Sequence, residues 1–138
     1  MTDPERFEAG LKMRKRVVGA EYVERAMAGA NDFTRPMQEL VTEYCWGEVW
    51  NRDGLTLRER SLLNIGMLTA LGQPEELKLH ARGALNNGAS VEELREVLLQ
   101  AAIYCGVPAA LAAMRAVGSA LGEAAVPLGD EGDDEGAR

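Results

Sequence analysis

Recurrent helix start and stop signals are the feature that most constrains how this chain folds. A Ser or Thr followed three residues later by Glu is a capping-box pattern that opens helices, and it occurs at residues 56–59 and 90–93. Residues that suit a first helical turn or a helix end stand between the apolar stretches: Pro36, Gly72, Pro74, Gly88, Gly106 and Pro108. No stretch alternates apolar and polar residues as a strand does. The chain is therefore expected to be all-α.

These signals divide the chain into six or seven helices with short connections, a pattern typical of an antiparallel helical bundle. The expected helices cover residues 5–18, 20–28, 34–50, 57–71, 74–87, 91–105 and 107–121. Residues 61–71 are apolar on nearly every side, which predicts a helix in the middle of the bundle. A length of 138 residues fits one domain. We expect a single helical domain over residues 1–122 and an acidic, disordered tail over 123–138.

The charge balance and the lack of long apolar runs exclude several partners. The formal net charge is −7, whereas a protein that binds the phosphate backbone of nucleic acids needs a clustered positive surface. No apolar run approaches the roughly 20 residues that cross a bilayer. The charged N-terminus is not followed by an apolar signal-peptide stretch. The sequence predicts a cytoplasmic protein that binds neither nucleic acid nor membrane.

Several chemical motifs are missing from the chain. There is no Gly-rich phosphate loop, no CxxC pair and no cluster of His, Cys and Asp at metal-ligand spacing. The two cysteines, Cys45 and Cys105, are too few for a disulfide framework and stand in apolar surroundings. Because His80 is the only histidine, a His-based metal site is not expected, and we predict no metal.

His80 shares one helical face with Glu76, Gly83 and Asn87, at spacings of four, three and four residues. Glu76 stands one turn before His80, and Gly83 leaves space one turn after it. A carboxylate at this position favours the protonated imidazole. His80 and Glu76 are therefore candidate acid–base residues beside a cavity, with His80 as a proton donor near neutral pH. The alternative is a half-buried core histidine with a solvated Glu76 partner that contributes little.

The expected helix over residues 34–50 has two apolar faces. One face consists of Met37, Leu40, Val41 and Tyr44. Trp46 and Trp50 point to roughly the opposite side. Because two tryptophans are costly on a bare surface, they are predicted to meet another subunit or to cover a pocket, with the interface favoured.

Three arginines are candidates for binding a carboxylate through the guanidinium fork: Arg58, Arg60 and Arg82. Most arginines at such positions are simply solvated. Arg60 is preferred because it stands at the start of the most apolar helix, with Asn64 one turn further on. Glu59 has a structural role available as the return acid of its capping box.

The segments that carry these residues resemble the 4-carboxymuconolactone decarboxylases. The resemblance begins at residues 34–36 (TRP) and 44–50 (YCWGEVW) and continues at 60–63 (RSLL) and 67–72 (MLTALG). It is closest over 75–88 (EELKLHARGALNNG) and 96–110 (EVLLQAAIYCGVPAA). The match covers nearly the whole chain to about residue 121 and leaves out the acidic tail.

This resemblance implies an all-α, alkylhydroperoxidase D-like fold that assembles into homo-oligomeric rings, a trimer or more commonly a hexamer. The implied reaction converts 4-carboxymuconolactone to the enol-lactone of β-ketoadipate during protocatechuate catabolism, with no cofactor. His80, with Glu76 setting its ionisation, is implied as the donor to the oxyanion or to carbon. Trp46 and Trp50 are expected to form an apolar wall, and Arg60 or Arg82 to bind the second carboxylate.

Three other interpretations of the resemblance stay open. Thiol peroxidases of the same superfamily use a Glu, a CxxC pair and a His, and here Glu59 and His80 match the Glu and the His. Gln73 and Glu76 occupy the cysteine positions, so peroxidase chemistry is disfavoured. The remaining alternatives are a related enzyme that acts on another lactone or keto acid and a non-catalytic helical ring. Such a ring would bind a small carboxylate or a protein partner.

Overall fold

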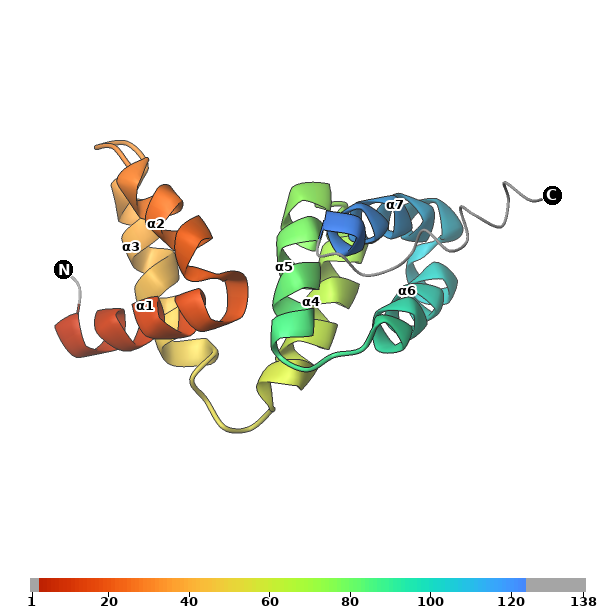
Figure 1. Ribbon diagram of the computed structural model, residues 1–138, viewed down its shortest axis with the longest axis horizontal. Helices are drawn as coiled ribbons and strands as arrows, with labels where there is room; N and C mark the ends of the chain where they lie inside the picture. Colours follow the sequence, from red (N-terminus) through yellow and green to blue (C-terminus); the bar gives the residue numbers. More distant parts are fainter. Residues whose placement is uncertain (1–2, 124–138) are drawn as a thin grey trace. The chain divides into compact units, whose positions relative to one another are not determined.

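The computed structural model describes residues 3–123, and every regular element within them is helical (Figure 1). The elements are α1 (Pro4–Val18), α2 (Ala20–Ala28), α3 (Arg35–Leu40), the π-helix η1 (Val41–Val49), α4 (Leu57–Leu71), α5 (Pro74–Asn86), α6 (Val91–Cys105) and α7 (Val107–Glu123). Seven α-helices within this part of the chain confirm the prediction of an all-α fold. The acidic tail predicted for residues 123–138 lies outside the described residues, apart from the last residue of α7.

The helices form two compact units, Met1–Arg60 and Ser61–Arg138. The first unit holds α1, α2, α3 and η1, and the second holds α5, α6, α7 and α4 from Ser61 onward. The single domain expected over residues 1–122 stays a prediction. No helix within residues 3–123 is long and apolar enough to cross a lipid bilayer.

In the first unit, α1 and η1 pack with their backbones in close contact. A Cβ atom on Gly10 would overlap the carbonyl oxygen of Thr42 and would lie 2.8 Å from the amide nitrogen of Gly47. A Cβ on Gly47 would in turn meet the carbonyl oxygen of Arg6. Only glycine fits at such an approach, so these two residues allow the helices to meet.

Buried polar side chains also join α1 to the α3–η1 segment. The guanidinium of Arg14 is buried and donates from Nη1 to Gln38 Oε1 at 3.0 Å and to Thr42 Oγ1 at 3.1 Å. The carboxylate of Glu43 is also buried, and Arg6 Nη1 lies 3.4 Å from its Oε2. A buried charge needs such partners, and the sequence pattern did not reveal them.

The helix predicted over residues 34–50 is in fact α3 followed by the π-helix η1. Its i→i+5 pattern is seen where the amide of Trp50 donates to the carbonyl of Cys45 at 3.0 Å. A π-helix turns less per residue than an α-helix, so a face assigned at 100° per residue does not hold within it. Such segments are frequent at functional sites.

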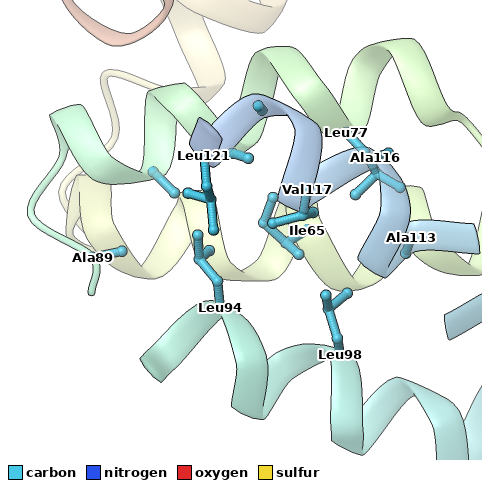
Figure 2. Packing of buried hydrophobic residues seen from close by; sticks show 12 residues of the cluster. Ile65, Leu77, Ala89, Leu94, Leu98, Ala113, Ala116, Val117 and Leu121 are labelled. Carbon is cyan, nitrogen blue, oxygen red and sulfur yellow. The ribbon is translucent and has the colours of Figure 1, made fainter. Parts of the chain in front are cut away.

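The core of the second unit is one cluster of buried apolar side chains from α4 to α7 (Figure 2). Its members are Ile65, Leu77, Ala81, Ala84, Ala89, Leu94, Leu98, Ala113, Ala116, Val117, Ala120 and Leu121. Small alanines on α5 and α7 let these two helices approach closely. This cluster fixes the position of α5, which carries His80.

The expectation that α4 is buried all round is wrong for the single chain. Its buried residues are Ser61, Ile65 and Thr69, one stripe at a spacing of four. Leu63 and Leu71 are 52% and 69% exposed. The apolar cluster covers only one side of α4, which leaves the other side open.

The predicted helix caps are confirmed. Thr56 and Glu59 exchange both hydrogen bonds of a capping box, at 2.8 and 3.1 Å, and Ser90 does the same with Glu93 at the start of α6. Gly88 ends α5 with a φ of +94°, and the amide of Ala89 donates back to Ala84 at 2.9 Å. This is a Schellman cap, which turns the chain sharply into α6.

Candidate active site

His80 lies on the side of α5 that packs toward α4, and only 7% of its surface is exposed. Its Nδ1 lies 3.4 Å from Nδ2 of Asn64 on α4. Its Nε2 lies 3.9 Å from Oε1 of Glu76, one helical turn earlier, whose side chain is 52% exposed. The structure therefore brings His80, Glu76 and Asn64 together inside the second unit.

A second polar pair aligns the same two helices. Asn87 donates from Nδ2 to Oγ of Ser61 at 2.9 Å, and Ser61 is fully buried. Residue 61 thus meets residue 87 while residue 64 meets residue 80, so α4 and α5 run antiparallel. This register presents the amide of Asn64 to the imidazole of His80.

Burial decides the ionisation of His80. Desolvation lowers the pKa of the imidazole from 6.5 to about 4, because the charged form loses its hydration inside the protein. The expectation that Glu76 keeps His80 protonated near neutral pH is therefore wrong. The distance of 3.9 Å is too long for a hydrogen bond, and water reaches the half-exposed carboxylate of Glu76 and screens it. At pH 7 the site holds a neutral histidine.

Trp46 and Trp50 lie in the first unit and are both buried, each 4% exposed. Their rings stack with centroids 4.8 Å apart and an interplanar angle of 21°. The predicted arrangement of faces is reversed, since Met37 and Leu40 are 60% and 52% exposed instead. The reason is that the tryptophan side of η1 is the one that packs inward. A role for the two rings in binding substrate stays a prediction.

The candidate arginines differ in their surroundings. Arg60, half-buried in the first turn of α4, donates from Nη2 to the carbonyl of Arg52 at 3.0 Å. Within residues 3–123, the Nε of Arg60 is a buried nitrogen with no hydrogen-bond partner, so it could receive a bound carboxylate. Arg82 is half-buried on α5, two residues after His80. Binding of the substrate carboxylate by Arg60 or Arg82 stays a prediction.

Glu59, the match to the leading Glu of the peroxidases, has the structural role instead. Hydrogen bonds from the backbone and then from the side chain of Thr56 lower the pKa of its carboxyl. The side chains of Cys45 and Cys105 are both exposed, although the sequence indicated apolar surroundings. In the part of the chain that the structure describes, no three His, Cys, Asp or Glu side chains are grouped to hold a metal ion.

The contact of Asn64 with His80 and the pair of Ser61 with Asn87 were missed by reasoning from the sequence. One signal existed, because Asn87 shares the helical stripe of His80 and is polar at the edge of an apolar face. The partners on α4 could not be found without the register between the two helices.

Comparisons with known proteins place the chain in a family. The profile of the carboxymuconolactone decarboxylase family matches residues 35–118. The nitrosuccinic acid decarboxylase npaB of Metarhizium robertsii is 52% identical over 108 residues, which cover 78% of this chain and 76% of that protein. The 4-carboxymuconolactone decarboxylase of Acinetobacter baylyi is 42% identical over 114 residues, which cover 83% of this chain and 85% of that protein.

The two relatives differ in substrate and share decarboxylation, which supports a decarboxylase role for this chain. The family match spans more than half of the sequence and includes α4, α5 and α6 in full. The helical fold around His80 is the one that this family shares. The chain belongs to the carboxymuconolactone decarboxylase family.

Proposed function

We propose that this protein decarboxylates a small dicarboxylate without a cofactor and that 4-carboxymuconolactone is the first candidate substrate. The observation that carries the proposal is the 42% identity to a 4-carboxymuconolactone decarboxylase over 85% of its length. The buried, neutral histidine on α5 supports it chemically, because such a group can act on an oxyanion as it forms.

The chemistry of this substrate needs no external electron sink. A carboxylate sits on the γ carbon of an unsaturated lactone, and loss of carbon dioxide leaves an electron pair on that carbon. The pair moves through the conjugated double bond onto the lactone carbonyl and forms a dienolate. One proton added at the α carbon then gives the enol-lactone product. The protein has to stabilise the dienolate oxygen and deliver that proton.

His80 suits the first of these tasks. A neutral imidazole donates one N–H to the developing negative charge, as neutral histidines do in other enzymes that polarise a carbonyl. Its burial removes competing water and strengthens this hydrogen bond. Glu76 is assigned to the second task, because its half-exposed side chain lies one turn from the imidazole and is open to solvent, the source of the proton.

The substrate-binding roles are assigned to the arginines and tryptophans that the sequence predicted. Arg60, and second to it Arg82, would bind the carboxylate that is retained, through the guanidinium. Trp46 and Trp50 would provide an apolar wall that removes water from the departing carboxylate, which raises its energy before the bond breaks. Among the residues that the structure describes, the buried Nε of Arg60 has no hydrogen-bond partner, which favours Arg60 over Arg82.

Nitrosuccinate is a second candidate because of the 52% identity to a nitrosuccinic acid decarboxylase. This molecule is also a dicarboxylate, and its nitro group stands beside one carboxylate. Loss of that carboxylate as carbon dioxide leaves an electron pair that the nitro oxygens accept, so the same donor would stabilise a nitronate. Both candidate substrates therefore require one hydrogen-bond donor at the developing oxyanion and one binding site for the second carboxylate.

The test is turnover of each compound by the purified protein, followed by the change in ultraviolet absorbance, with His80→Gln in parallel. We expect one of the two to be consumed by the native protein and His80→Gln to reduce kcat by at least about 100-fold. The double variant Cys45→Ser/Cys105→Ser serves as a control and should retain activity. No turnover of either compound would refute the proposed substrate class.

We also propose that the protein works as a homo-oligomer, a trimer or a hexamer. Large apolar side chains are exposed on α6, with Ile103 at 79% and Tyr104 at 81%. Between α4 and α6 lies an apolar groove of about 690 Å³, which Tyr104 helps to line. Exposed apolar surface of this kind marks interaction sites. Sedimentation equilibrium of the full chain tests this expectation, and a monomer at micromolar concentration would contradict it.

A further inference from the structure

The side chain of Asn64 on α4 lies against the ring of His80, at 3.4 Å from Nδ2 to Nδ1. The nitrogen of a carboxamide carries two hydrogens and accepts no hydrogen bond. In this contact Nδ1 of the imidazole must therefore be the acceptor. A neutral imidazole has one N–H, so its proton is then on Nε2.

We propose that Asn64 is a positioning residue that holds His80 in its Nε2–H tautomer, with the donor directed to the side of α5 that carries Glu76. The inference rests on the proposed function only for its catalytic consequence. The tautomer itself is a property of the protein without substrate. Nε2 faces Glu76 Oε1 at 3.9 Å, so the donor lies on the side of the half-exposed carboxylate.

The surrounding contacts explain why Asn64 can hold this position. The neighbouring bond from Asn87 to the buried Ser61 fixes α4 against α5 one turn away. Ile65, the next residue after Asn64, is fully buried in the apolar cluster and sets the rotation of α4 about its axis. The amide thus faces the ring in a fixed register, which lowers the entropy lost when the hydrogen bond forms.

The consequence for the reaction is specific. If the proton were on Nδ1, the nitrogen on the Glu76 side would be an acceptor and would repel an oxyanion. Wrong tautomers of this kind cost other enzymes several orders of magnitude in kcat while leaving the fold intact. Asn64 acts through His80 and needs no contact with the substrate.

The experiment is a nitrogen NMR spectrum of the full chain with ¹⁵N-labelled histidine, recorded at pH 8 without substrate. Since His80 is the only histidine, its two ring nitrogens give the only ring signals of the labelled residue. The protonated and unprotonated nitrogens are well separated, and their couplings to the ring hydrogens identify each one. We expect the native protein to show Nε2–H.

Two variants and a matched control complete the test. Asn64→Asp replaces the donor with an acceptor and should move the proton to Nδ1. Asn64→Leu removes the donor, and the two nitrogen signals should move toward each other as both tautomers contribute. Ser90→Ala removes the capping box of α6, away from the contact of Asn64 with His80, and should leave the tautomer unchanged. An Nδ1–H tautomer in the native protein, or an unchanged tautomer in Asn64→Asp, would overturn the inference.

Activity measurements separate this inference from the proposed function. With a substrate that is turned over, Asn64→Asp should lower kcat by at least about 100-fold and change KM by less than about threefold. If neither candidate substrate reacts while the tautomer is as expected, the proposed function fails and the role of Asn64 stands. Turnover by a native protein with the Nδ1–H tautomer would refute the role of Asn64 alone.

Discussion

The ionisation of His80 can be measured directly, because the chain contains one histidine and its ring hydrogens need no assignment. We expect the ring signal to titrate with a pKa of about 4, lowered from 6.5 by burial. The difference corresponds to roughly 3 kcal/mol between the two protonation states. Proton NMR of the folded protein between pH 3.5 and 8 is the assay.

The same shift has a consequence for stability. Since the pKa of His80 is lower in the folded state, the unfolded chain binds the proton more tightly. The contribution of neutral His80 to the free energy of unfolding is therefore fully present above pH 6.5 and is lost as the pH falls toward 4. Between pH 7 and pH 5 the loss amounts to about 2 kcal/mol of the free energy of unfolding. Urea unfolding at these two pH values measures it.

Two variants show whether burial or the carboxylate dominates. His80→Gln removes the titrating group. Between pH 7 and pH 5, the free energy of unfolding of this variant should therefore fall by about 2 kcal/mol less than that of the native protein. Glu76→Gln should leave the pKa of His80 below 5, because burial and not Glu76 sets it. A native pKa at or above 6.5 would refute the reasoning and would restore the ion pair with Glu76.

Further predictions concern packing, capping and the thiols. Gly10→Ala should destabilise the protein by about 2 kcal/mol or more, measured by urea unfolding, because the added Cβ overlaps the backbone of η1. Gly118→Ala on α7, where a Cβ meets nothing within 4 Å, should instead stabilise it by up to about 1 kcal/mol. Ser90→Ala removes a capping box and should lower the free energy of unfolding by about 1 kcal/mol. Cys45 is exposed and should react with a thiol reagent in the folded protein without loss of activity.

Local signals predicted the helices well because caps and turns act over a few residues. The capping boxes at Thr56 and Ser90 and the end of α5 at Gly88 stand where the sequence placed them. Each depends on one side chain and on backbone groups within one helical turn. No knowledge of the tertiary structure was needed for these elements.

Predictions that depended on a helical wheel failed where the helix is not an α-helix or where its neighbours were unknown. The inward side of η1 carries Trp46 and Trp50, and the outward side carries Tyr44, because the i→i+5 pattern and the close approach of α1 at Gly10 set the rotation. The open side of α4 at Leu63 is a further case. Apolar residues all round a helix do not say whether its own chain or another one covers them.

In the candidate site too, features set by neighbouring residues in the sequence were predicted, and features set by the tertiary structure were not. Glu76 was found as the neighbour of His80 because an i, i+4 spacing is a local fact. Its electrostatic effect was overestimated, because the sequence does not say how deeply each side chain is buried. The half-exposed carboxylate of Glu76, 3.9 Å from the ring, is screened by water and has little effect on the pKa of His80. The ring itself is only 7% exposed, so its loss of hydration lowers that pKa strongly.

A neutral histidine changes what this site can do for its substrate. A protonated imidazole would bind the carboxylates of the ground state strongly, and uniform binding of that kind does not raise kcat. A neutral N–H gains most when negative charge develops on the oxygen beside it, that is, as carbon dioxide departs. Under the proposed function, the burial that lowers the pKa of His80 would favour the transition state over the bound dicarboxylate. The same argument holds for a dienolate and for a nitronate, so the proposed arrangement of His80 and Asn64 would serve either candidate substrate.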